Sequence, residues 1–409
     1  MNKRVVVTGG AAITPLGSDW DTIEAGLRAK ENAVVRMSEW DRYDGLNTRL
    51  AAPADWTAPK YPRKKTRGMG RVSYMAVHAT EMALEKAGLI DHPILTSGKA
   101  GISYGSSTGN VDALLDFYSM LTDDTVQGIS ATTYIKSMPQ TCAVNIGVFF
   151  GLTGRMLTSN TACTSGSISI GLGYESIREG KQTVMLCGGA EEMGPANAAV
   201  FDTLFATSTR NDAPKTSPSP FDKDRDGLVI GEGAGTLVLE EYEHAKARGA
   251  KIYAELVGFG TNTDGVHITQ PNKETMEQAL HLALESGGLK ADDIDYVNGH
   301  GTATQHGDIA ESQATRNCFK RKIPYSSLKS YFGHTLGACG AIESWLTINM
   351  MNIGWIAPNL NLNELDSNCG ELDYIQEDGR EFNPEYAMCN NFAFGGINTS
   401  LIFKKWDQE

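Results

Sequence analysis

The chain has 409 residues, of which 41% are hydrophobic and 21% are charged, a balance typical of a globular protein with a large core and two or three domain-sized units. The net charge of −13 argues against a nucleic-acid groove, which needs a basic surface. No run of 18 apolar residues occurs and the N-terminus MNKRVVVTGG leads straight into an apolar strand, so we expect neither a membrane span nor a signal peptide. The seven cysteines are scattered without a CxxC pair, which indicates neither a disulfide framework nor a zinc site and favours a reducing cytoplasm.

Strand-like and helix-like segments alternate along the chain, which predicts an α/β fold with partly parallel sheets. The first series has strands at 3–8, 100–104 and 183–187 and helices at 21–30, 74–87 and 166–180. The second series has strands at 252–258 and 294–298 and helices at 273–286 and 308–318. Both series open on an apolar strand that runs into glycine, VVVTGG and AELVGFG, so we predict two similar halves, residues 1–250 and 251–409.

Cys163 lies in SNTACTSGSISIGLG, between an extended segment and a predicted helix rich in small residues. A thiol at a helix N-terminus feels the positive end of the helix dipole, which lowers its pKa and favours the nucleophilic thiolate. A buried cysteine also serves as a small hydrophobic residue, so the local sequence alone leaves a structural role open.

Two histidines also lie among small residues. His300 is flanked by glycines in VNGHGTATQHGD, and His334 follows Lys329 in SLKSYFGHTLGACGAIE. Glycines on both sides would let a substrate approach an imidazole closely. His300 with His306 could bind a metal, but no third ligand has suitable spacing, and a structural histidine is the alternative for His334.

Three further segments have less specific patterns. CNNFAFGGINTSLIF predicts two strands joined at Gly395-Gly396, where backbone N–H groups could face an oxyanion or the segment could be an ordinary hairpin. SPSPFDKDRDGLVIGEGAG is interpreted as a loop fixed by Asp–Arg pairs, because its glycines do not open a dinucleotide-binding βαβ unit. The basic run YPRKKTRGMGR is either a solvated loop or a docking site for an acidic partner.

Taken in order, TACTSG, SPFDKDRDGLVIGEGAG, VNGHGTATQHGD, SLKSYFGHTLGACGAIE and NNFAFGGIN closely resemble the elongating, type II β-ketoacyl-acyl-carrier-protein synthases. The similarity runs from residue 5 to residue 405. It implies a thiolase fold of two similar βαβαβ halves in five αβαβα layers, normally as a dimer. It also implies an acyltransferase that condenses malonyl-carrier protein, with loss of CO₂, onto an acyl chain held on the enzyme.

The resemblance assigns expected roles to residues of this sequence. Cys163 matches the acyl-accepting nucleophile, and His300 and His334 match the two catalytic histidines. Lys329 matches the active-site lysine, and we expect it to pair with Glu311. No metal and no redox cofactor is expected, since the substrates travel on the phosphopantetheine arm of acyl carrier protein. Further matches are the gating and oxyanion residue Phe394, the pantetheine contacts Thr302 and Thr304, and the substrate contacts Thr108 and Phe201.

Some positions depart from the usual family pattern. FAFGGIN has Ala393 where glycine is usual and Ile397 where threonine is usual, and Gln305 stands where proline is usual. Thr108 falls where the housekeeping enzyme has a bulky aliphatic residue in the acyl tunnel. These departures favour a specialised synthase of polyene or polyketide pathways, with aryl-polyene synthases as the leading hypothesis, over housekeeping fatty-acid elongation.

We expect acyl carrier protein to dock at Lys64, Lys65 and Arg67. The partner subunit could be a second copy or a paralogous chain-length factor. Three alternative functions would require different features. A non-catalytic chain-length factor would lack the nucleophile, a thiolase would use a second catalytic cysteine, and a cysteine hydrolase would need a water path to the acyl group.

Overall fold

The computed structural model describes residues 2–407, which form alternating strands and helices. The longer strands are β1 (Val5–Ile13), β4 (Ala100–Gly105), β5 (Met156–Ser159), β6 (Val184–Glu191), β8 (Gly233–Glu241), β9 (Ala254–Thr263), β15 (Tyr386–Ala393) and β16 (Ile397–Lys405). The short strands are β2 (Val35–Arg36), β3 (Leu50–Ala52), β7 (Ile230–Gly231), β10 (Tyr296–Asn298), β11 (Pro324–Ser326), β12 (Trp355–Ile356), β13 (Asp373–Tyr374) and β14 (Arg380–Glu381). The helices are α1 (Trp20–Arg28), α2 (Arg63–Thr66), α3 (Arg71–Ala87), α4 (Asp112–Asp123), α5 (Ala131–Ser137), α6 (Thr141–Phe150), α7 (Ser165–Arg178), α8 (Pro195–Asp202), α9 (Tyr242–Ala247), α10 (Lys273–Gly287), α11 (Gln305–Phe319), α12 (Lys329–Phe332) and α13 (Cys339–Ile353).

Two sets of five strands share one topology. The first set has the order β1-β8-β6-β4-β5, and the second has the order β9-β16-β15-β10-β11, with β13 beyond β11. In each set the first two strand pairings are antiparallel and the last two are parallel. The sets join where β1 pairs with β9. This correspondence confirms the prediction of two similar halves. The precise division after residue 250, between α9 and β9, stays a prediction.

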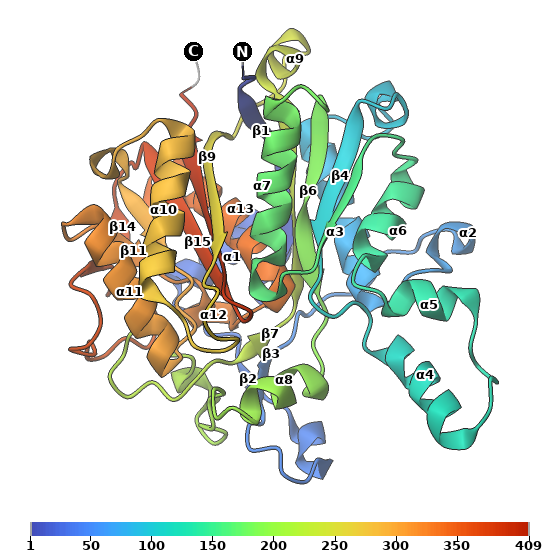
Figure 1. Ribbon diagram of the computed structural model, residues 1–409, viewed down its shortest axis with the longest axis horizontal. Coiled ribbons are helices and arrows are strands. Elements are labelled where there is room, and N and C mark those ends of the chain that lie inside the picture. Colours follow the sequence, from blue (N-terminus) through green and yellow to red (C-terminus); the bar gives the residue numbers. More distant parts are fainter. Residues whose placement is uncertain (1, 408–409) are drawn as a thin grey trace.

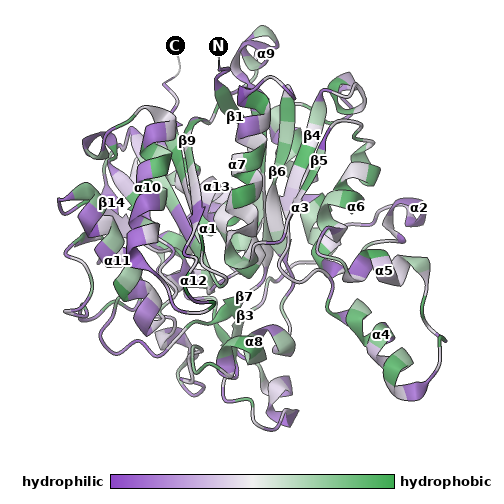
Figure 2. Ribbon diagram, in the orientation of Figure 1, coloured by the Kyte–Doolittle hydropathy of each residue, from purple (hydrophilic) through white to green (hydrophobic). Residues whose placement is uncertain are grey.

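The helices form three layers around the two sets of strands (Figure 1). Helices α3 and α6 pack on the first set, α10 and α11 cover the second, and α7 and α13 lie between the two sets and contact each other. Many residues of the outer helices α10 and α11 are hydrophilic, whereas hydrophobic residues predominate along β1 (Figure 2). The expected five-layered α/β fold is therefore confirmed.

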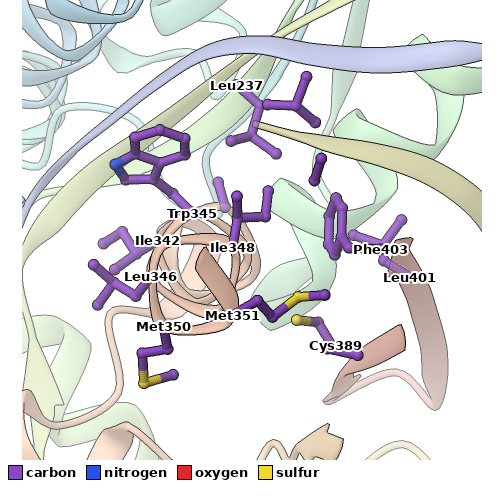
Figure 3. Close-up of a cluster of buried hydrophobic side chains, with 14 of the residues drawn as sticks. Leu237, Ile342, Trp345, Leu346, Ile348, Met350, Met351, Cys389, Leu401 and Phe403 are labelled. Atoms are coloured by element: carbon purple, nitrogen blue, oxygen red, sulfur yellow. The ribbon is translucent and has the colours of Figure 1, made fainter. Parts of the chain in front are cut away.

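The central layer forms the core of the molecule. Every residue of α13 from Cys339 to Met351 is buried, and its Ile348 and Met351 face side chains of the neighbouring strands, among them Phe403 and Cys389 (Figure 3). A helix that is apolar on all sides is expected where sheets cover it from both directions. No helix among residues 2–407 is both long and apolar enough to cross a lipid bilayer.

The starts of α7 and α13 approach each other closely because both begin with small residues. A Cβ added at Gly166 would lie 3.0 Å from the Ala341 nitrogen, and one added at Gly340 would lie 2.9 Å from the Ser167 nitrogen. This reciprocal contact brings the turns before the two helices together. Both turns are short 3-10 helices. The first, Ala162–Thr164, contains Cys163, and the second, Leu336–Ala338, comes directly after the His334-Thr335 segment.

Several strands are longer than the sequence predicted. The strand expected at 3–8 continues to Ile13, and the strand expected at 183–187 continues to Glu191. In both cases the ladder to β8 runs across a glycine pair, Gly9-Gly10 and Gly188-Gly189. Glycine weakens an isolated strand, but the backbone hydrogen bonds of a central ladder outweigh that preference.

Candidate active site

Cys163 lies in the turn that links β5 to α7, where the chain changes direction sharply. The preceding residue, Ala162, has a φ of 49°, in the left-handed region that costs a non-glycine residue about 1 kcal/mol or more. The Cys163 side chain is buried, with 5% of the residue exposed. The local structure therefore holds the thiol at a strained turn, as expected of a positioned nucleophile rather than of a core residue inside a regular helix.

The two histidines lie beside this thiol. His300 follows β10 and His334 follows α12. The Cys163 Sγ and one ring nitrogen of each histidine lie within 4.8 Å of one another, and the two imidazole planes are perpendicular, with centroids 5.0 Å apart. The structure thus brings together three residues that are far apart in sequence. His306, the alternative partner of His300 for a metal, is exposed and does not belong to this group.

Hydrogen bonds determine which nitrogen of each imidazole carries the proton. The Leu336 backbone N–H donates to His334 Nδ1 at 3.2 Å, and the Asn391 amide donates to His300 Nδ1 at 3.4 Å. With Nδ1 as acceptor in both rings, the neutral tautomer has its proton on Nε2. Within the described chain, His334 Nε2 is buried without a hydrogen-bond partner. It is therefore a donor available for a substrate oxygen.

Both histidines are held neutral. Burial lowers the pKa of His300 and of His334 well below the usual 6.5, and the Lys329 ammonium lowers both pKa values further. Two neutral imidazoles that donate from Nε2 suit stabilisation of a developing negative oxygen, because such donors need not lose a proton to act.

Opposing effects act on the pKa of the Cys163 thiol. Burial raises its pKa to about 12, whereas Lys329 and the backbone N–H groups of Phe394 and of Cys163 itself lower it. The lowering expected at a helix start therefore does not decide the pKa of this thiol, because desolvation outweighs the groups that lower it. The two N–H groups converge on the sulfur, so they are also placed to stabilise an oxyanion on a carbon bonded to it.

The predicted pairing of Lys329 with Glu311 is wrong. The Lys329 ammonium forms a salt bridge with Glu343 of α13, and each of these side chains is only 1% exposed. The other Glu343 oxygen accepts from the Asn391 amide at 2.8 Å. Asn391 also donates to His300, so the ion pair is linked directly to one catalytic-site imidazole.

Glu311 instead fixes the backbone at His300. Its carboxylate accepts from the N–H groups of His300 and Gly301, at 2.5 and 2.8 Å, and from the Tyr325 hydroxyl at 2.7 Å. Burial raises the pKa of Glu311 to about 7, although these donors lower it. Glu311 therefore positions the His300 turn and does not neutralise the lysine.

A cavity of about 490 Å³ leads to this group from the surface. Thr302 and Thr304 line it, with their hydroxyl oxygens 2.9 Å apart. Phe201 and Phe394 also line it, and their ring centroids lie 5.2 Å apart. The remaining candidate substrate residue, Thr108, lies outside this lining, on the loop after β4. The structure thus places Thr302, Thr304, Phe201 and Phe394 around one opening.

The residues expected to dock acyl carrier protein lie on the surface outside the lining of this cavity. Lys64, Lys65 and Arg67 are exposed on and just after α2. The Lys65 ammonium donates to the Phe149 carbonyl at 2.9 Å, whereas Lys64 and Arg67 do not form that hydrogen bond.

The segment interpreted as a loop fixed by Asp–Arg pairs contains Arg225, which binds Asp366 at 2.8 Å.

Sequence reasoning missed Glu343 and Asn391. Glu343 is the one acidic residue within the apolar sequence of α13, and such a charge in a buried helix requires a partner. That signal could have identified it. Asn391 lies in NNFAFGG, but nothing in its sequence context indicates contacts with both Glu343 and His300.

Comparisons with known proteins agree over almost the whole chain. Residues 2–245 match the family described as beta-ketoacyl synthase, N-terminal domain, and residues 253–363 match its C-terminal domain. The 3-oxoacyl-[acyl-carrier-protein] synthase 2 of Vibrio harveyi is 35% identical over 412 residues, covering 98% of this chain and 99% of the relative. A crystal structure of a beta-ketoacyl synthase from Burkholderia phymatum STM815 is 56% identical with a TM-score of 0.98, covering 99% of this chain and 100% of that chain.

A further solved structure, the ishigamide ketosynthase/chain length factor, is 30% identical with a TM-score of 0.88, and the match covers 100% of both chains. These findings confirm the resemblance inferred from the ordered motifs and the thiolase fold that it implied. They also identify the general reaction, since the named relatives extend acyl chains by forming carbon–carbon bonds. The chain therefore belongs to the beta-ketoacyl synthase family of acyl-transferring enzymes.

Proposed function

We propose that Cys163 carries the growing acyl chain and that His300 and His334 stabilise the enolate formed from malonyl-carrier protein. The observation that supports this most directly is the convergence of the thiol and the two imidazoles within 4.8 Å, with an unpartnered His334 Nε2–H. A non-catalytic chain-length factor would have no use for this combination.

In the first half-reaction the Cys163 thiolate attacks the carbonyl carbon of an acyl thioester. A sulfur–carbon bond forms, the bond to the carrier sulfur breaks, and the proton of the Cys163 thiol ends on the released carrier thiol. The Lys329 charge and the N–H groups of Cys163 and Phe394 favour the thiolate. The same N–H groups stabilise the oxyanion of the tetrahedral intermediate.

In the second half-reaction the malonyl group loses its carboxylate as CO₂, and the electron pair of the broken bond forms an enolate. The enolate oxygen accepts hydrogen bonds from Nε2 of His300 and of His334. Its carbon then attacks the acyl carbonyl on Cys163, a carbon–carbon bond forms, and Cys163 leaves as the thiolate. These steps need no metal and no redox cofactor, because the Cys163 thiolate and the substrates supply every electron pair and no atom changes its oxidation state through an outside oxidant or reductant.

The cavity fits a substrate carried on a flexible arm. It connects the surface to Cys163, and Thr302 and Thr304 provide hydroxyl groups along it for the amides of a pantetheine arm. We infer that acyl carrier protein delivers both substrates and docks through Lys64, Lys65 and Arg67. The Vibrio harveyi relative is named as a synthase of 3-oxoacyl-[acyl-carrier-protein], which supports this class of partner.

For the pathway, a specialised polyene or polyketide synthase is favoured over housekeeping fatty-acid elongation. Thr108 is the residue that motivates this, since it places a small polar side chain where an aliphatic wall is usual. The match to the ishigamide ketosynthase/chain length factor supports a heterodimer with a paralogous subunit as an alternative to the homodimer.

Intact-mass measurement after mixing the protein with a panel of acyl-carrier-protein thioesters tests the proposal. We expect an acyl adduct that is absent in Cys163→Ala and is consumed, with CO₂ release, when malonyl-carrier protein is added. His334→Ala should still form the adduct but should consume it at least about a hundredfold more slowly. An adduct on Cys163→Ala, or release of free acid without malonyl consumption, would overturn the proposal.

A further inference from the structure

Asn197 of α8 is a buried amide with one unused hydrogen-bonding atom. The residue is 8% exposed, and its Oδ1 is buried without a partner among the described residues. Its Nδ2 donates to the Thr108 hydroxyl at 3.3 Å. Leaving a buried acceptor unpaired costs about 1–3 kcal/mol, so a donor that reaches this oxygen would form a favourable hydrogen bond.

Asn197 lies next to the wall of the cavity described above. Asn197 and Phe201 are four residues apart on α8 and therefore share one face of the helix. Phe201 lines the cavity that contains Cys163 and packs against Phe394. The polar pair of Asn197 and Thr108 consequently lies one helical turn beyond the aromatic wall.

Thr108, the second residue of the polar pair, is linked to the catalytic site through hydrogen bonds to Glu191. This buried carboxylate accepts from the Thr108 backbone N–H at 3.2 Å and from the Gly337 N–H at 3.0 Å. Gly337 belongs to the turn that follows His334, and the Glu191 charge contributes to the pKa of Cys163. The polar pair is thus held at a fixed position relative to the nucleophile.

We propose that Asn197 and Thr108 form a specificity site for a hydroxyl group on the acyl chain bound to Cys163. This rests on the proposed role of Cys163 as acyl carrier. The chain reaches the site when it displaces the contact between Phe201 and Phe394. Its hydroxyl donates to Asn197 Oδ1, which supplies the partner that this oxygen lacks.

The hydrogen-bond pattern distinguishes a hydroxyl from other groups. The Asn197 Nδ2 already donates to Thr108, so the free atom is an acceptor and requires a donor. A keto group only accepts and leaves Oδ1 unpaired, and a methyl end leaves the whole amide unsatisfied. Sites built to bond a substrate hydroxyl reject analogues that lack it more strongly than apolar pockets reject an added group.

The test compares acylation of the protein by carrier-protein thioesters in matched series that end in a methyl, keto or hydroxyl group, over a range of chain lengths. We expect kcat/KM for the best hydroxyacyl chain to exceed that for the matching alkyl chain about tenfold, equivalent to roughly 1.4 kcal/mol. Asn197→Leu, which keeps the branched shape but removes both polar atoms, should abolish this ratio. Thr108→Val, which keeps the shape, should reduce it. Val200→Ala, on the exposed face of the same helix, controls for disturbance of α8 and should keep the ratio.

Equal loading of alkyl and hydroxyacyl chains by the wild type would overturn the specificity site while leaving the acyl-carrier role intact. A hydroxyl preference that persists in both Asn197→Leu and Thr108→Val would also overturn it, because the recognising groups would lie elsewhere. Absence of any acyl adduct in the wild type would instead refute the proposed function and, with it, this inference.

Discussion

Replacing Lys329 by methionine removes one partner of a buried ion pair, and the structure predicts two separate effects. Both side chains of the Lys329–Glu343 pair are 1% exposed, so water cannot compensate the remaining carboxylate. Removing one partner of such a pair costs about 3–5 kcal/mol of unfolding free energy. Lys329→Met should therefore be strongly destabilised.

The double variant Lys329→Met/Glu343→Gln separates this cost from catalysis. Glutamine keeps an acceptor for the Asn391 amide, and the double variant leaves no buried charge at the pair. It should recover most of the lost stability, because neutral replacement of a buried pair is often close to energetically neutral.

Catalysis should not recover in the double variant. Lys329 lowers the pKa of both His300 and His334, and it lowers the pKa of Cys163 against the effect of burial. Without Lys329, the histidine pKa values rise toward 6.5, so the acid limb of the decarboxylation pH profile should move to higher pH in both variants. The thiolate is also less favoured, so acylation should slow.

Urea unfolding followed by tryptophan fluorescence measures the first effect, and the pH dependence of CO₂ release measures the second. The reasoning would be refuted if the double variant were no more stable than Lys329→Met. An acid limb at the same pH in all three proteins would refute the electrostatic role of the lysine.

Two further predictions follow from other parts of the structure. The carboxyl of Glu311 has a pKa of about 7 in the folded protein, above its usual 4.5, so the folded state binds more protons between these values and loses stability as the pH rises through them. The stability difference between wild type and Glu311→Gln should shrink by about 3 kcal/mol over that window, and a difference independent of pH in urea unfolding would contradict it. Lys64→Glu and Arg67→Glu should raise KM for acyl carrier protein at low salt, with kcat unchanged and the effect lost at high salt. Lys65→Glu should combine this effect with a loss of stability through its bond to Phe149, and an unchanged KM in all three variants at low salt would exclude docking at α2.

The sequence located the reactive side chains better than it located their partners. Cys163, His300 and His334 could each be proposed because small residues surround a side chain capable of chemistry, and the ordered motifs indicated the family. The sequence could have marked Glu343 as a buried acid in need of a partner, but its pairing with Lys329 is a contact of the folded chain that local patterns do not predict. Periodicity found most strands but ended them at glycine pairs, since the ladder to β8 that carries them onward is a long-range contact.

For the pKa of Cys163, too, the sequence indicated the local structure but not the long-range contacts. The sequence indicated that the thiol would precede a helix, and the structure confirms that the turn leads directly into α7. The depth of burial, which outweighs the helix dipole, depends on contacts with residues of the second half of the chain. Cys339, for example, donates from its thiol to the Cys163 carbonyl at 3.2 Å.

The two turns before α7 and α13 have matching geometry but different residues at their centres. Cys163 is the middle residue of the first turn and Gly337 is the middle residue of the second, and each turn begins with a residue of nearly equal positive φ, 49° at Ala162 and 48° at Leu336. A side chain at Gly337 would lie 2.7 Å from the Glu191 carboxylate and 2.8 Å from the Ser107 nitrogen. The Glu191 carboxylate, which holds the neighbouring loop, fills the space that a side chain at Gly337 would need, so a single substitution at Gly337 could not place a second thiol opposite Cys163.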